Sequence, residues 1–133
     1  MKLSGQELKK LFSAIGSEQT LRSILLEFYQ LMSRDLLIGY FFDGKSLEKI
    51  AENQKNFLLK AWGVTKSYSG LSPARAHDEL PNILQGHFDR RLILLNEVLD
   101  KYGVPASAIK TWIAFENSFR KKLVKEEKAR NQQ

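Results

Sequence analysis

The feature that most constrains the fold is the spacing of apolar residues, which follows a helical period along nearly the whole chain. Apolar side chains recur three and four positions apart, as one buried face of an α-helix requires, and no segment is a convincing strand. This spacing predicts an all-α chain with a short turn or corner over residues 36–42. A first, short helix is expected over residues 8–15, and further helices over 21–32, 47–61, 88–102 and 109–123.

Glycine, serine and proline mark the expected ends of these helices. Gly16 ends the first helix, Ser17 is a good N-cap for the second, and Gly63 closes the third. Pro73 suits the first position of a helix, whereas Pro81 pushes the residue before it out of the helical region. The segment between these prolines is therefore expected to be a helix of about two turns.

Length and composition indicate one domain without disulfides. The chain has 133 residues and a mass of 15.3 kDa, and we expect one domain over residues 1–133, with a short N-terminal helix over 1–16 and a basic polar tail over 125–133. Because there is no cysteine, disulfides, zinc–thiolate sites, iron–sulfur clusters and thiol nucleophiles are excluded. No apolar run approaches the roughly 18 residues that a membrane span needs. A cytoplasmic protein that does not enter the membrane is expected.

The positive charge is concentrated at the C-terminal end. The formal net charge is +6, and residues 120–133 hold six basic and two acidic residues, which accounts for +4 of it. A nucleic-acid surface needs a broad basic face, so a solvated helix end is the simpler interpretation, and no nucleic-acid partner is expected. There is also no catalytic triad, P-loop, dinucleotide fingerprint or HExxH motif, and hydrolytic chemistry has no support.

His77 is the first residue that could hold a metal. A lone histidine is more often a surface or hydrogen-bonded core residue. However, the short helix between Pro73 and Pro81 can bury little surface by itself, and a bond from His77 to iron would fix it in place. A neutral imidazole is the usual proximal haem ligand in oxygen-binding proteins. His87, at the start of a long amphipathic helix, competes for this role, although an interfacial role is simpler there.

Gln54 and Tyr29 are polar groups on predicted buried faces. Gln54 lies in the centre of the apolar stripe of the third helix, where an amide must find hydrogen-bond partners. It either bonds to a backbone carbonyl or faces a ligand. Tyr29 follows Phe28 on the second helix and either packs in the core or points its hydroxyl at a partner such as Gln54.

With these residues in order, the chain resembles the truncated haemoglobins, the short globins built as a two-over-two helical sandwich. The resemblance covers roughly residues 8–124. Its motifs are EFYQLMSRD, YFFDGKSL, QKNFLLKAWG, YSG, ARAHDEL, HFDRRL and LDKYGVP. Each motif is weak by itself, but together and in this order they are typical of the family. The tyrosine–glutamine pair and the lack of tryptophan at position 91 favour its first group.

Carried over residue by residue, the resemblance implies a pocket for haem b. His77 becomes the proximal iron ligand, Tyr29 the distal hydroxyl donor and Gln54 its amide partner. Phe42 becomes the aromatic side chain stacked on the haem, and Ile50 falls where other globins often carry a distal histidine. The other residues implied to line or close the pocket are Phe41, Phe57, Leu58 and Tyr68.

The chain departs from the family pattern at two corners, between the first two helices and after the third, and at one pocket position. Paired glycines are usual at these corners, which here read Gly16-Ser17 and Gly63-Val64, so one glycine remains at each. Arg91 sits where some subgroups carry tryptophan and others a small apolar residue. A cation near haem is costly unless it reaches a propionate or water.

The resemblance implies a protein that binds dioxygen reversibly at ferrous iron, with nitric oxide and carbon monoxide as further ligands. It also implies oxidation of nitric oxide to nitrate with a separate reductase, since the chain has no room for a flavin or nicotinamide domain. A monomer or weak dimer is expected. Gas sensing and oxygen storage are alternatives. So is a haem-free helical protein-interaction module.

Overall fold

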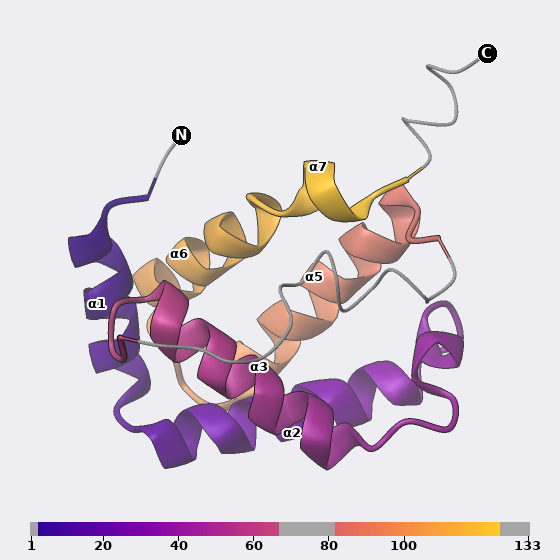
Figure 1. Cartoon of the computed structure of the whole chain (residues 1–133), viewed down its shortest axis with the longest axis horizontal. Helices are drawn as coiled ribbons and strands as arrows, with labels where there is room; N and C mark the ends of the chain where they lie inside the picture. Colours follow the sequence, from indigo (N-terminus) through magenta and orange to yellow (C-terminus); the bar gives the residue numbers. More distant parts are fainter. Residues whose placement is uncertain (1–2, 67–81, 126–133) are drawn as a thin grey trace.

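The computed structural model describes residues 3–66 and 82–125 of the chain, and these residues form helices joined by short turns (Figure 1). The all-α class predicted from the apolar spacing is confirmed. Strand-like pairing within the described residues is limited to an isolated parallel bridge between Ile83 and Val124. The elements are α1 (Gly5–Ile15), α2 (Glu18–Ser33), the 3-10 helix η1 (Gly39–Phe42), α3 (Leu47–Ala61), α5 (Gln85–Lys101), α6 (Ala106–Asn117) and α7 (Arg120–Leu123).

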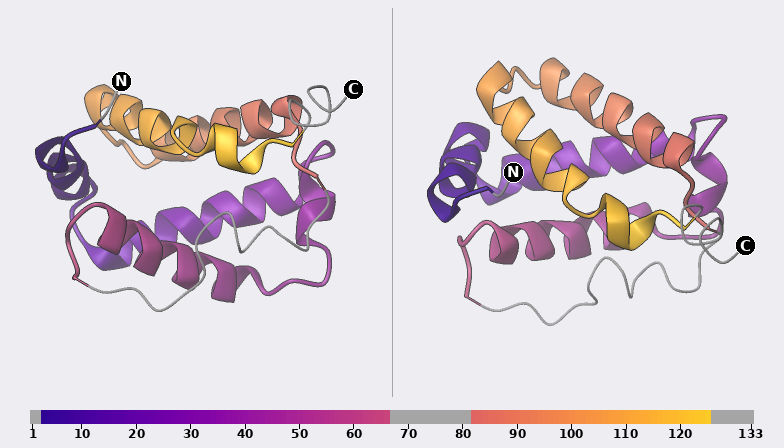
Figure 2. Two further views of the ribbon diagram at one scale, coloured as in Figure 1. Left: turned by 45° about the horizontal axis from the view of Figure 1, so that its top comes forward. Right: turned by 90° about the horizontal axis from the view of Figure 1, so that it is seen from above.

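The helices form two layers of two (Figure 2). One layer is α2 packed on α3, the other is α5 packed on α6, and α2 also contacts α5 between the layers. Helix α1 lies at one end and contacts α6. This arrangement is the two-over-two sandwich that the resemblance implies. No helix in the described ranges is long and apolar enough to cross a membrane.

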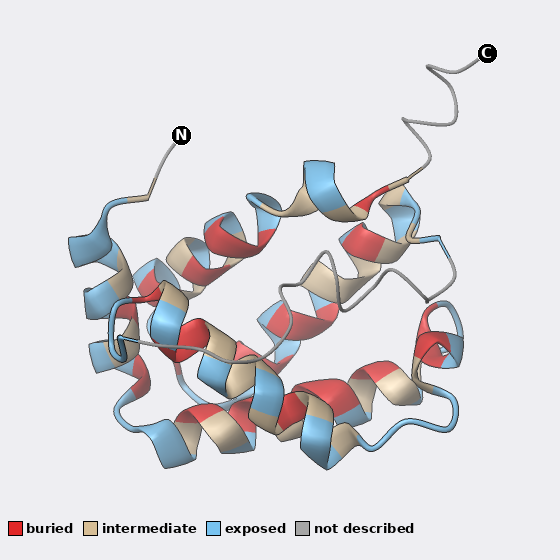
Figure 3. Ribbon diagram, in the orientation of Figure 1, coloured by how far each residue is buried: buried red, intermediate tan, exposed pale blue. Residues whose placement is uncertain are grey.

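The core fills the space between the layers, and Figure 3 shows the buried residues on the inward faces of the helices. Two tryptophans, Trp62 at the end of α3 and Trp112 of α6, form its centre with ring centroids 5.0 Å apart and planes at 84°. Burying an apolar side chain of this size stabilises the fold by about 1.5–3 kcal/mol. Phe28 and Phe88 are also almost fully buried.

A single glycine is sufficient at each of the two helix corners. Gly16 and Gly63 take positive φ angles of 107° and 78°, a region that residues with a Cβ rarely adopt. Ser17 then has an extended backbone, and its hydroxyl accepts a hydrogen bond from the Thr20 N–H at 3.1 Å, so the predicted N-cap is confirmed. Val64 donates its N–H to the Leu59 carbonyl at 2.8 Å.

The prediction of one continuous helix over residues 109–123 is wrong, because the helix breaks between α6 and α7. At the break the Ser118 hydroxyl donates to the Phe115 carbonyl, which competes with the helical ladder. The Phe119 ring then packs edge-on against Phe115 and Phe57, with centroid distances of 5.2 Å and 5.9 Å. Apolar spacing alone did not reveal the break, because Phe119 remains on the buried side.

Gly39 allows the turn after α2 to approach the end of that helix closely. A Cβ on Gly39 would lie only 2.7 Å from the Ser33 carbonyl oxygen. This neighbour is backbone at a helix end, so it cannot rotate away as a side chain would. The close approach positions η1, which carries Phe41 and Phe42, beside the helical layers.

We expect Gly39→Ala to lower the free energy of unfolding by about 1–3 kcal/mol, because the added methyl group forces the backbone apart. Gly86→Ala is the matched control, since nothing lies within 4 Å of a Cβ at that helical position. It is expected to be neutral or to stabilise by up to about 1 kcal/mol. Urea unfolding of both variants beside the parent measures the difference. Equal losses would show that the close approach at Gly39 is not the cause.

Candidate functional site

A cavity of about 370 Å³ opens between the two helical layers. This volume lies within the usual range for sites of small molecules and cofactors. The walls come from α2, η1, α3, α5, α6 and α7, so segments far apart in the sequence meet here. Its lining residues are Tyr29, Met32, Ile38, Phe41, Phe42, Lys45, Lys49, Ile50, Asn53, Gln54, Phe57, Ile83, His87, Phe88, Arg91, Phe115, Glu116, Phe119 and Leu123.

Most residues that the sequence assigned to a pocket line this single cavity. The predicted residues on its wall are Tyr29, Phe41, Phe42, Ile50, Gln54 and Phe57. Leu58 is not among the lining residues; it is fully buried and belongs to the hydrophobic core. The remaining two, Tyr68 and His77, lie outside the described residues.

Helix α3 presents one face to the cavity because its lining residues follow helical spacing. Ile50, Asn53, Gln54 and Phe57 are separated by three, one and three positions, which places them on one side of the helix. Gln54 is half-buried, at the centre of this face. Gln54 on α3 and Tyr29 on α2 therefore line the same cavity. A hydrogen bond between their side chains remains a prediction from the sequence.

Tyr29 is a buried residue on the α2 wall of the cavity. Its ring is only 6% exposed and packs against Phe28 at 5.4 Å and edge-on against Phe42 at 5.8 Å. Burial raises the pKa of Tyr29 above its ordinary 10.0; the charge and hydrogen bonding of Arg91 oppose the shift, and the charge of Glu116 reinforces it. The hydroxyl is therefore neutral at physiological pH and keeps its hydrogen for donation.

An ion pair between α5 and α6 lies at the same cavity. Arg91 Nη1 is 2.5 Å from Glu116 Oε2, and the other carboxylate oxygen accepts a hydrogen bond from Trp112 Nε1 at 3.0 Å. The guanidinium also sits 5.1 Å from the centre of the Phe28 ring, a cation–π contact. Burial lowers the pKa of Arg91, but the Glu116 carboxylate and then Tyr29 more than offset this, and the side chain stays charged.

The structure gives Arg91 a partner that sequence analysis did not consider. A propionate and water were the partners named as able to make a cation near haem tolerable, whereas in the structure a carboxylate of this same chain pairs with the guanidinium. Glu116 was missed, although an acid inside the apolar stripe formed by Trp112, Phe115 and Phe119 was a visible signal. Side chains of opposite charge on the apolar faces of two adjacent helices indicate a buried pair.

His87 has hydrogen-bonding roles near the mouth of the cavity. Its Nδ1 accepts a hydrogen bond from the Leu84 N–H at 3.0 Å, at the start of α5. The other nitrogen lies 3.5 Å from the Tyr40 hydroxyl, and the ring meets Phe41 edge-on at 5.2 Å. Because Nδ1 accepts, the proton of the neutral ring belongs on Nε2. These contacts agree with the interfacial role expected for this histidine.

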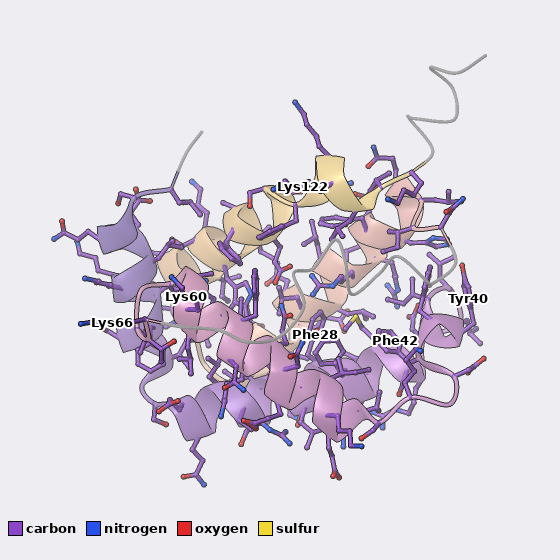
Figure 4. All side chains as sticks on the ribbon, in the orientation of Figure 1. Phe28, Tyr40, Phe42, Lys60, Lys66 and Lys122 are labelled. Atoms are coloured by element: carbon purple, nitrogen blue, oxygen red, sulfur yellow. The ribbon has the colours of Figure 1, made fainter. Side chains whose placement is uncertain are left out.

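The residues that line the cavity fit a haem group. Its walls are mostly apolar and aromatic, which suits the macrocycle, and Figure 4 shows Phe28 and Phe42 directed into the interior while Lys122 points away. Two exposed lysines, Lys45 and Lys49, lie at its margin, where they would pair with the carboxylates of such a group. Residues 3–66 and 82–125 contain no cluster of three metal-ligating side chains.

Comparisons with known proteins agree with this fit. The sequence profile of the bacterial-like globin family matches residues 10–125. A group 1 truncated hemoglobin, GlbN of Synechocystis sp., is 31% identical over 105 residues, which cover 77% of this chain and 85% of the relative.

Solved structures show the same fold at lower sequence identity. The truncated hemoglobin of Tetrahymena pyriformis in its Fe(III) form superposes with a TM-score of 0.78 and 23% identity, covering 86% of this chain and 97% of that one. The 2/2 hemoglobin of Synechococcus sp. PCC 7002, in the cyanomet state with covalently attached heme, has a TM-score of 0.78 and 22% identity, covering 87% and 98%. This chain therefore belongs to the bacterial-like globin family, whose members bind haem, and is a truncated haemoglobin most like those of group 1.

Proposed function

We propose that this globin holds haem b in the cavity between its layers, with His77 as the proximal ligand, and binds dioxygen reversibly at ferrous iron. The observation that carries the proposal is the buried, neutral Tyr29 on the wall of a cavity lined mostly by apolar and aromatic side chains. A hydroxyl in such a place stabilises a ligand that accepts hydrogen bonds. The haem would supply the iron at which the gas binds, and the protein would supply orientation and hydrogen bonds.

The residues that line the cavity would have different roles in binding the haem and its ligand. Tyr29 and Gln54 would donate hydrogen bonds to the bound gas, whose outer atom carries negative charge. Phe42 would pack on the macrocycle, while Lys45 and Lys49 would bind its propionates at the margin. The apolar remainder of the wall would exclude water, which strengthens these hydrogen bonds.

We further propose that the oxygen-loaded protein oxidises nitric oxide to nitrate. Nitric oxide and dioxygen together contain all the atoms of nitrate; a ferrous haem would supply the one electron that is needed, and an external reductase would have to return it after each turnover. Mixing the oxygen-loaded protein with nitric oxide is expected to give one equivalent of nitrate and the ferric spectrum. Failure to form nitrate would leave gas binding as the activity.

An absorption spectrum of the protein expressed with haem available tests haem binding first. An intense Soret band that shifts on reduction with dithionite, and again with carbon monoxide, is expected for a histidine-ligated haem. His77→Ala should weaken or alter this band, because it removes the proposed iron ligand. Imidazole added to the His77→Ala protein should restore part of the original spectrum.

The other histidine provides a direct comparison. His87→Ala is expected to retain the shift with carbon monoxide, because that imidazole is engaged at the start of α5 and with Tyr40. The reverse pattern, with the band lost in His87→Ala and kept in His77→Ala, would exchange the roles of the two histidines. A colourless wild-type protein that also fails to take up haemin would refute the proposal.

A further inference from the structure

A cation lies at the wall of a cavity that otherwise consists mainly of apolar and aromatic groups. Arg91 lines the cavity, and its side chain is only 23% exposed. The other basic groups on the wall, Lys45 and Lys49, are exposed residues at the margin. Among the described residues, Arg91 is therefore the cation that is placed to act on a ligand inside the pocket.

The ion pair leaves part of the guanidinium available. An arginine carries five N–H donors and no acceptor. Within the described part of the chain, Arg91 donates a short hydrogen bond to Glu116 Oε2 and a further hydrogen bond to the Tyr29 hydroxyl. Glu116 also accepts from Trp112, so its carboxylate is held on the α6 side of the pair. The other N–H groups of Arg91 can therefore serve a ligand in the cavity.

We propose that Arg91 makes the ligand pocket a binding site for small inorganic anions, and that Glu116 sets the strength of this site by partly neutralising the guanidinium. The proposal rests on haem occupying the cavity, as proposed above. Hydrogen bonds between charged groups are roughly twice as strong as those between neutral groups, and a site of low polarity strengthens them further. The two members of the ion pair therefore act in opposite directions: the cation favours an anionic ligand and the carboxylate disfavours it.

Fluoride and azide titrations of the ferric, haem-loaded protein test this site, with the absorption spectrum as the readout. Arg91→Gln is expected to weaken the affinity for both anions by at least about tenfold, since it removes a charged donor but keeps an amide that can bond to Glu116. Glu116→Gln is expected to increase the affinity for both anions by at least about fivefold, because the cation loses its countercharge. Arg91→Lys should retain affinity between those of the parent and Arg91→Gln.

Two comparisons separate an anion site from a general change in the pocket. Arg90→Gln is the matched control, because Arg90 is adjacent in sequence but pairs with Asp35 at 2.8 Å and does not line the cavity. It should leave both anion affinities unchanged. Carbon monoxide is an uncharged ligand, so its affinity for the ferrous protein should change by less than about threefold in the Arg91 and Glu116 variants.

Opposite shifts for Arg91→Gln and Glu116→Gln are the expected signature, because a pair with only a structural role would change affinity in the same direction in both variants. Equal or same-direction shifts, in proteins that still show the Soret band, would overturn the anion site and leave haem binding intact. If the wild-type protein takes up no haem, the proposed function fails first, and the anion site fails with it. Arg91→Lys and Glu116→Gln keep the test decisive if Arg91→Gln does not fold.

Discussion

Tyr29→Phe is expected to speed the release of dioxygen from the ferrous protein by about 10- to 150-fold, which corresponds to the loss of one hydrogen bond worth roughly 1.5–3 kcal/mol. The Tyr29 hydroxyl is buried on the cavity wall, and burial keeps it neutral and able to donate. Phenylalanine fills the same space, so the contacts with Phe28 and Phe42 remain, while the hydroxyl is lost both as a donor to the ligand and as an acceptor for Arg91. Stopped-flow displacement of dioxygen measures the rate.

Carbon monoxide and a second tyrosine provide the controls. Carbon monoxide forms a less polar adduct, so its release should change much less in Tyr29→Phe. Tyr40→Phe should leave oxygen release unchanged, because Tyr40 does not line the cavity and its hydroxyl lies beside His87. An unchanged oxygen release rate in Tyr29→Phe would refute the donor role, even in a protein that binds haem normally.

Glu116→Leu is expected to lower the free energy of unfolding by about 3 kcal/mol, because it leaves the buried Arg91 without its countercharge. The carboxylate of Glu116 is 8% exposed and its partner 23%, so little water is present to replace it. Trp112 Nε1 also loses its acceptor. For a domain of this size the loss corresponds to a fall of about 10 °C in the melting temperature. Calorimetry or thermal unfolding monitored by circular dichroism measures it.

The double variant Arg91→Leu with Glu116→Leu is expected to recover most of this loss. Replacing both charges with apolar side chains removes the cost of desolvating them, and such replacements are often neutral or stabilising by about 1–4 kcal/mol. If the double variant is instead less stable than Glu116→Leu, the pair contributes more to stability than an apolar contact would. Recovery of stability together with loss of anion affinity would show that the pair serves ligand binding.

The sequence by itself determined the helices and most of the cavity wall. Helical spacing of apolar residues requires one buried face per helix, and capping rules identify where a helix can begin, as Ser17 shows. The same periodicity placed Ile50, Gln54 and Phe57 on one face of α3, and the structure brings that face to the cavity. These are local properties, so they can be read from neighbouring residues.

Tertiary structure decided the features that depend on two helices meeting. The break between α6 and α7 depends on a serine that bonds to its own backbone, and on where Phe119 finds other rings. The family resemblance implies that Leu58 lines or closes the pocket, whereas in the structure Leu58 is fully buried in the hydrophobic core and is not among the residues that line the cavity. Periodicity defines a buried face, but it does not say which neighbour covers each residue on that face.

The pairing of Arg91 with Glu116 shows this limit most clearly. Each charge alone appears in the sequence as an exception within an apolar stripe, and nothing local indicates that the two are 2.5 Å apart. The crossing of α5 and α6 brings them together and places the pair at the cavity. A charge in a core is tolerated only where a countercharge meets it, and the position of the countercharge is a property of the three-dimensional packing.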